Sequence, residues 1–297
     1  MGDKLQGDYL VRGTAAEGMI RAFAVTSRET VQAARDCHGT SPIATAALGR
    51  LLMGGQIMGA MLKGSDELIT LAIRGDGPLG GVLVTADTHG NVKGFVNNPD
   101  VWLEPNEHGK LDVGGAVGAG MLTVIQDMPG IEPFVSQVNL ATGEIGDDLA
   151  EYFSMSEQIP TSVGLGVLIG RGLEVKQAGG FIVQLMPGYD DHALNALEAN
   201  LMGVSSITSL LEEGMAPEDI LELILRGLDF QILESCPVRY HCGCNAERAA
   251  RVILTLGADE LRGMVERGED AEYTCNFCGK RYSMSPDEIK ELLESAR

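Results

Sequence analysis

Basic residues are scarce in this sequence of 297 residues: 22 Lys and Arg stand against 42 Asp and Glu, which gives a formal net charge of −20. The acidic excess lies in residues 1–235, with 13 basic and 31 acidic residues, whereas residues 236–297 hold 9 and 11. A negative field of this size repels phosphate backbones. The charge therefore argues against nucleic-acid binding.

The N-terminus lacks an apolar leader. Met1 to Leu5 include the charged residues Asp3 and Lys4, and the hydrophobic stretch of a secretory signal is missing. We expect a cytoplasmic protein, whose six cysteines are reduced and form no structural disulfide framework. Metal ligation or thiol chemistry is then the expected use of the cysteines.

A membrane span is not expected. The longest apolar stretch, Ser41 to Leu62, holds Arg50 and Gln56 in its middle, where hydrocarbon would penalise both side chains. Ser41 can cap a helix whose first residue is Pro42. We predict a buried or half-buried helix of a soluble domain, and no membrane partner.

Nucleotide-binding fingerprints are also missing. The glycine-rich runs Gly75 to Gly81 and Gly114 to Gly120 match neither the order nor the context of the dinucleotide motif, and no phosphate-loop Lys-Ser/Thr follows them. We interpret both runs as tight turns or as places where helix and strand pack closely.

The N-terminal part, residues 1–182, is predicted to be an α+β domain. Hydrophobic residues make up 44% of the sequence and charged residues 22%, as in globular proteins, and the length fits more than one domain. Beyond short β-compatible runs in Asp8 to Thr26, the strand candidates are Leu68 to Ile73, Leu79 to Ala86, Val92 to Val96, Met121 to Asp127, Phe134 to Asn139, Val163 to Ile169 and Gly180 to Leu185.

Residues 183–234 have the pattern of a helical linker. Apolar residues recur at three- and four-residue spacings in His192 to Glu213 and in Pro217 to Leu228. Such helices are stable only if their apolar faces are buried against something else. We expect them to lie across the first domain.

Residues 235–297 are predicted to be a small zinc-binding domain. Asn245 can cap a helix over Ala246 to Leu256, and Ser285 with Glu288 forms a capping box that opens a final helix. The cysteines of this part come in two close pairs, Cys242 with Cys244 and Cys275 with Cys278. Four thiolates are the set that a tetrahedral Zn²⁺ prefers.

The complete thiolate set argues against an enzyme. Four protein ligands leave zinc no open position for water, and no carboxylate or histidine lies near enough in sequence to suggest a general base. Cys236 could be a spare ligand or a third redox thiol, and His241 could replace a sulfur. Because the four-thiolate set is complete, we expect both to be bystanders. Cys37 and His38 could suggest a nucleophile and its base, but side chains adjacent in sequence seldom point at each other. We expect Cys37 to be buried or half-buried instead.

The energetics of the zinc module allow a switch. Zinc binding in such modules contributes roughly 10–16 kcal/mol, while a whole domain is stable by about 5–15 kcal/mol. A pair with one intervening residue, Cys242 and Cys244, gives a small disulfide ring on oxidation that is sensitive to redox conditions. A static zinc ribbon that binds a protein partner or nucleic acid is the alternative, and spacing alone does not decide between them.

Several motifs closely resemble the heat-shock protein 33 family of redox-regulated chaperones. The resemblance spans most of the chain. The motifs that carry it are Arg226-Gly-Leu-Asp-Phe230, Cys236-Pro-Val-Arg-Tyr-His-Cys-Gly-Cys244, Cys275-Asn-Phe-Cys278, His38-Gly-Thr-Ser-Pro42, Gly75-Asp-Gly-Pro-Leu-Gly-Gly81 and Asp112-Val-Gly-Gly115.

The resemblance implies a function. In this family the reduced, zinc-bound form is inactive, and oxidants form two disulfides and release zinc. Carried over, the disulfides are Cys242 with Cys244 and Cys275 with Cys278. Linker unfolding and homodimer formation then give an ATP-independent holdase, which binds unfolding client proteins and later passes them to ATP-dependent foldases.

Overall fold

The structure is a computed structural model that describes residues 6–204 and 206–295. It divides into two compact units, Met1–His241 and Cys242–Arg297. Each unit has its own hydrophobic core. The mixed α+β architecture of the first unit confirms the predicted fold class.

The first sheet of the larger unit is antiparallel and has the strand order β10-β1-β2-β9-β8. Its strands are β1 (Tyr9–Ala15), β2 (Ile20–Thr26), β8 (Thr161–Ile169), β9 (Val175–Leu185) and β10 (Gln231–Pro237). A short 3-10 turn, η1 (Ala16–Gly18), joins β1 to β2.

The second sheet has the order β11-β5-β4-β3-β6-β7. Its strands are β3 (Leu68–Gly75), β4 (Val82–Asp87), β5 (Asn91–Val96), β6 (Gly120–Asp127), β7 (Phe134–Asn139) and β11 (Arg239–Tyr240). The strands expected between residues 68 and 139 are confirmed. β4 starts later than expected because Leu79 belongs to the preceding turn, where its amide donates to Ala116 O.

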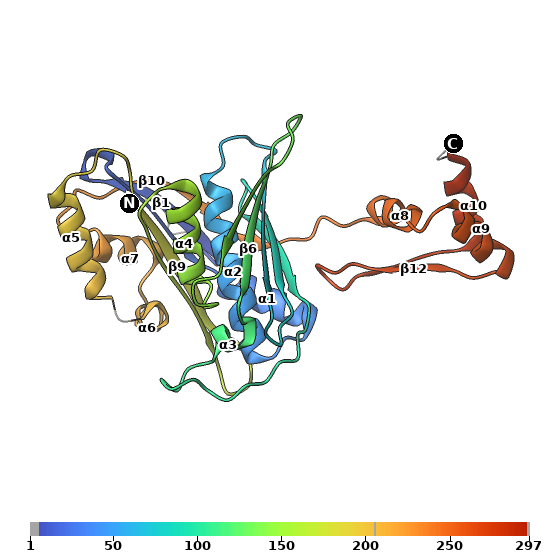
Figure 1. Ribbon diagram of the computed structural model, residues 1–297, viewed down its shortest axis with the longest axis horizontal. Helices are drawn as coiled ribbons and strands as arrows, with labels where there is room; N and C mark the ends of the chain where they lie inside the picture. The colour runs from blue at the N-terminus through green and yellow to red at the C-terminus, as the bar shows by residue number, and fades with distance from the viewer. Residues whose placement is uncertain (1–5, 205, 296–297) are drawn as a thin grey trace. The chain divides into compact units, whose positions relative to one another are not determined.

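Helix α2 (Pro42–Met61) lies between the two sheets (Figure 1). Ser41 caps it, since the Ser41 Oγ accepts a hydrogen bond from the Ala44 amide at 3.3 Å. Nearly the whole helix is buried in one core that includes side chains of both sheets. None of the described helices combines the length and apolar character that crossing a lipid bilayer requires.

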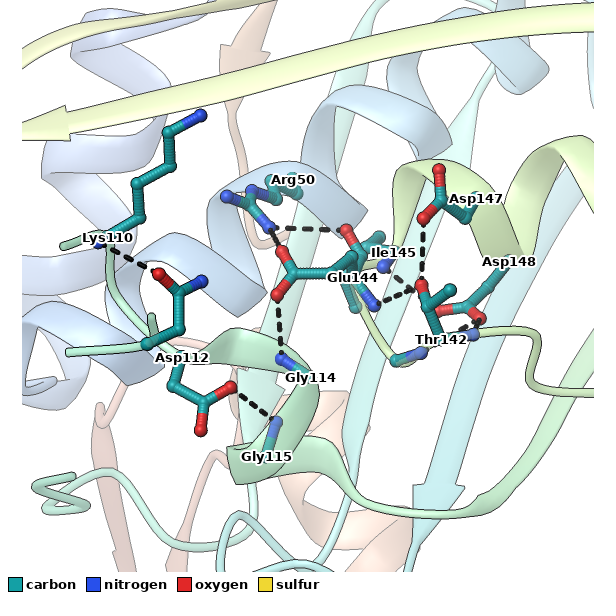
Figure 2. A network of polar contacts seen from close by, with 12 residues as sticks. Arg50, Lys110, Asp112, Gly114, Gly115, Thr142, Glu144, Ile145, Asp147 and Asp148 are labelled. Atoms are coloured by element: carbon teal, nitrogen blue, oxygen red, sulfur yellow. Dashed lines mark hydrogen bonds and ion pairs between the residues drawn. The ribbon is translucent and has the colours of Figure 1, made fainter. Parts of the chain in front are cut away.

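Arg50, in the middle of α2, forms an ion pair inside the protein through its Nη1, while its buried Nε has no hydrogen-bond partner among the described residues. Its Nη1 donates to the carboxylate of Glu144, whose other oxygen accepts from the Gly114 amide at 3.1 Å (Figure 2). The first part of the glycine-rich run at residues 114–120 belongs to the short helix α3 (Val113–Val117), which is capped by Asp112. The remaining helices on this side of the first sheet are α1 (Arg28–His38), α4 (Gly146–Tyr152) and the π-helical turn η2 (Phe153–Glu157).

The other face of the first sheet is covered by three helices of the predicted linker, α5 (Asp191–Met202), α6 (Ile207–Glu212) and α7 (Pro217–Ile224) (Figure 1). The helix expected over His192 to Glu213 is therefore not continuous, because Met202 ends α5 before Ile207 begins α6. The expectation that the linker lies across the first domain is met by these contacts.

One strand of the first sheet was not expected. Residues Gln231–Pro237 pair antiparallel with β1, and Leu10 lies opposite Cys236. The side chains of this strand are mostly exposed. Because neither face of the strand is buried, its sequence shows little of the apolar–polar alternation that would have predicted it. The three-part division at residues 182 and 234 stays a prediction.

The smaller unit contains α8 (Ala246–Leu254), α9 (Ala258–Arg267), the hairpin of β12 (Ala271–Thr274) and β13 (Arg281–Met284), and α10 (Pro286–Ser295). Asn245 caps α8 through its side chain, which accepts from the Arg248 amide at 2.8 Å. Ser285 and Glu288 form the expected capping box of α10. Both predicted caps are confirmed.

Candidate metal centre and the covered sheet

Four cysteine thiols converge in the smaller unit. Cys242 and Cys244 precede α8, and Cys275 and Cys278 lie in the turn between β12 and β13. That turn is fixed by the Cys275 amide, which donates to Lys280 O at 2.9 Å. Gly279 follows with a positive φ of 69°, a conformation that favours glycine.

The distances fit a tetrahedral metal site. The Cys242 and Cys275 Sγ atoms are 3.7 Å apart, those of Cys244 and Cys278 are 3.4 Å apart, and all four lie within 4.8 Å of one another. Sulfurs placed about 2.3 Å from a central Zn²⁺ would be separated by about 3.8 Å. The structure therefore brings together the four residues that the sequence singled out, in an arrangement that could hold one metal ion.

A tyrosine supports this site from the neighbouring strand. The Tyr282 hydroxyl donates to Cys244 Sγ at 3.1 Å, and its ring stacks on Tyr273 with centroids 6.3 Å apart. Burial acts to raise the pKa of Cys244, but hydrogen bonds, first the one from Tyr282, outweigh it and lower that pKa to about 7. Burial raises the pKa of Cys278 to about 12. The sequence analysis missed Tyr282, since nothing in its spacing marks it.

The smaller unit has a small hydrophobic core. Its central cluster has four buried side chains, Ile253, Leu261, Ala271 and Ile289, and six partly buried hydrophobic side chains pack against them. Burying each large one contributes about 1.5–3 kcal/mol, whereas ordering a residue costs about 1–2 kcal/mol in backbone entropy. We therefore expect the fold of this unit to depend on a cross-link at its cysteines.

The other sulfur and imidazole candidates are not members of the cluster. Cys236 is half-buried on β10, and His241 is exposed with its amide bonded to Val92 O at 2.8 Å. The expectation that Cys37 is buried or half-buried is wrong, because this thiol is exposed. The buried positions of α1 are Thr30, Val31 and Ala34, and Cys37 lies in the last turn, beyond the last of these buried positions.

A second feature of functional interest is the apolar face of the first sheet. Strand side chains such as Ile20 and Val183 pack there against linker side chains such as Leu211 and Leu221. Two glycines let helix α6 come close: a Cβ at Gly166 would lie 2.8 Å from Thr208 Cγ2, and one at Gly179 would lie 2.7 Å from Leu211 Cδ1. The linker thus covers a large apolar surface.

The chain combines an α+β unit, whose first sheet is covered by linker helices, with a small unit that contains four clustered thiols. These two features define the class of protein: an α+β domain followed by a small candidate metal-binding domain. The family model described as Hsp33 protein matches residues 8–285. The chain belongs to the Hsp33 family.

Known relatives agree over nearly the whole chain. A protein named 33 kDa chaperonin from Agathobacter rectalis is 51% identical over 285 residues, covering 96% of this chain and 99% of that protein. One of the same name from Caldanaerobacter subterraneus subsp. tengcongensis is 45% identical, covering 98% and 99%. The crystal structure of the 33 kDa chaperonin (heat shock protein 33 homolog) from Thermotoga maritima matches with a TM-score of 0.90 at 39% identity, covering 97% of this chain and 98% of that one. Family membership supports a chaperone function.

Proposed function

We propose that this protein is a redox-regulated, ATP-independent holdase that is inactive while reduced and zinc-bound. The single observation that carries the proposal is the convergence of Cys242, Cys244, Cys275 and Cys278 in a unit with only a small core. Zinc held by these thiolates would supply a structural cross-link and no reaction chemistry. The protein is then not an enzyme.

The switch step is oxidation of the thiols by peroxide. Each pair of thiols loses two protons and two electrons to one hydrogen peroxide. One S–S bond forms in the protein, the O–O bond of the peroxide breaks, and two waters are released. Each disulfide removes two of the thiolates that hold the ion. Because the unit depends on that cross-link, the same oxidation that releases the metal unfolds the module.

The pairing of the disulfides follows the family resemblance: Cys242 with Cys244 and Cys275 with Cys278. In the reduced geometry, the distances of 3.7 and 3.4 Å join cysteines of different pairs. Peptide mapping of the oxidised protein distinguishes the two arrangements. Crossed disulfides would contradict the pairing and leave the switch itself standing.

The output of the switch is an exposed apolar surface. If the linker helices unfold with the module, the face of the first sheet that contains Ile20 and Val183 becomes accessible to unfolding client proteins. We propose that the active form is a homodimer, that it hands clients to ATP-dependent foldases, and that it works in the cytoplasm, where thiols rest in the reduced state.

The test measures aggregation of a chemically unfolded client in the presence of the reduced or the peroxide-treated protein, with zinc release followed by a chromogenic chelator. We expect protection only after oxidation, with one zinc released per chain. A Cys37→Ser variant is the matched control and should switch normally. Equal protection in both states would contradict redox regulation and favour a static zinc module.

A further inference from the structure

Strand β8 is an edge strand of the first sheet. It pairs with β9 on one side, and within residues 6–204 and 206–295 no strand pairs with its other side. From Thr161 to Ile169 the strand contains no charged residue and no proline, and its side chains are all half-buried. Natural sheets usually blunt an edge with charge, proline or a covering element.

A cavity of about 790 Å³ runs along this edge. Every residue of β8 from Ser162 to Ile169 lines it, flanked by α2 on one side and by linker residues such as Val204 and Thr208 on the other. The cavity therefore gives access to a length of strand rather than to one side chain. Backbone donors and acceptors along a strand edge can bind any extended polypeptide.

The cavity along β8 forms a trough, and its charge differs from that of the chain as a whole. Arg50 and Lys110 line it, and no Asp or Glu does, although the chain carries a net charge of −20. Arg50 is paired with Glu144, but the Lys110 ammonium has no carboxylate within ion-pair distance among the described residues (Figure 2). The trough thus complements a negative charge on its occupant.

The trough is continuous with the surface that the linker covers. Helix α6 lies against β8 at Gly166, where its Thr208 both lines the trough and contacts the strand. Release of α6 would widen the trough and join it to the apolar face of the first sheet. A segment docked on β8 could then extend across that face.

We propose that the free edge of β8 docks an extended, apolar segment of an unfolded client that carries an acidic side chain, as an added strand of the first sheet. The inference rests on the proposed holdase function and names the surface that the client uses. Main-chain pairing explains binding without sequence preference, and Lys110 adds a preference for acid.

The direct test is amide hydrogen exchange of the full-length oxidised protein with and without a chemically unfolded client. We expect slower exchange in residues 161–169 when the client is bound, and unchanged exchange in β7, an edge strand of the second sheet. If the oxidised protein prevents aggregation while β8 exchanges at an unchanged rate, the docking proposal fails and the holdase function stands. Protection of β8 that follows protein concentration without client would instead identify a second copy as the occupant and overturn the proposal.

An edge-blocking variant gives an independent measurement. Lysine on an edge strand disfavours the addition of another strand, so Ser162→Lys should weaken client capture by the oxidised protein. Gln137→Lys, on the exposed edge strand β7, is the matched control and should capture clients normally. Both variants must keep wild-type circular dichroism in the reduced state. A correctly folded Ser162→Lys protein with full capture would contradict the proposal.

The charge preference is measured with two peptides bound to the oxidised full-length protein: a short Val- and Thr-rich peptide with a central Glu, and the same peptide with Lys. We expect the Glu peptide to bind about fivefold more tightly. Lys110→Glu should abolish or reverse this preference, whereas Lys63→Glu, outside the trough, should keep it. Equal affinity of both peptides for the wild-type protein would refute the acidic preference.

Discussion

The Tyr9 hydroxyl donates a hydrogen bond of 2.8 Å to Glu218 Oε2, which ties the first strand of the sheet to linker helix α7. Burial, with Glu218 as the second cause, raises the pKa of Tyr9, so the phenol keeps its proton and stays a donor. A bond to a charged acceptor contributes about 1.5–3 kcal/mol. This bond is one of the few polar contacts that hold the linker on the apolar face.

Tyr9→Phe removes this bond without changing the packing of the ring. We expect residues 217–224 of the reduced protein to exchange their amide hydrogens faster, because α7 is held less firmly, and we expect less peroxide to be needed for activation. Tyr189→Phe, at an exposed tyrosine, is the control. Unchanged exchange in α7 would show that the bond does not restrain the linker.

Gly166→Ala should loosen helix α6 in the reduced protein. The new Cβ would lie 2.8 Å from Thr208 Cγ2, and overpacking of this kind typically costs about 1–3 kcal/mol. We expect increased binding of a hydrophobic dye before any oxidation. Thr208→Ser, which removes the clashing methyl group, should rescue the variant.

The control for that experiment is Gly203→Ala. Gly203 has a right-handed helical conformation, and the nearest atom to its Cβ would be Asn200 O at 3.3 Å, outside the sheet contact. The Gly203→Ala variant should leave binding of the hydrophobic dye unchanged. If Gly166→Ala behaves the same way, the linker does not depend on close approach at this glycine.

Removal of the metal should melt the smaller unit and leave the larger one folded. The cores of the two units are separate, and the smaller core has few buried side chains. Chelation of zinc from the reduced protein should therefore remove the helical signal of α8, α9 and α10 from the far-ultraviolet circular dichroism spectrum. Retention of the full signal would mean that the cysteines do not hold this unit together.

Tyr282→Phe should weaken metal binding while the unit stays folded. The change removes the 3.1 Å hydrogen bond to Cys244 Sγ and keeps the ring stacked on Tyr273. Loss of such a supporting bond typically lowers metal affinity about 10- to 100-fold. Competition with a chromogenic chelator measures the effect, and an affinity equal to that of the wild type would assign Tyr282 a packing role only.

The sequence by itself determined the features that depend on residue type and short spacing. The close cysteine pairs indicated the metal site, Ser41 and Asn245 indicated helix starts, and alternating apolar residues indicated most strands. These signals are local because a cap, a strand period or a two-thiol turn involves only a few neighbouring residues.

Only the tertiary structure decided the features that join distant parts of the chain. Residues 231–237 form a strand because β1 offers a partner, and Cys37 is exposed because it lies in the last turn of α1, beyond the buried positions of that helix. The contact of Gly166 with Thr208 and the free edge of β8 likewise depend on which elements become neighbours in space. Such pairings arise from packing between segments far apart in sequence, and a single sequence carries no local signal for them.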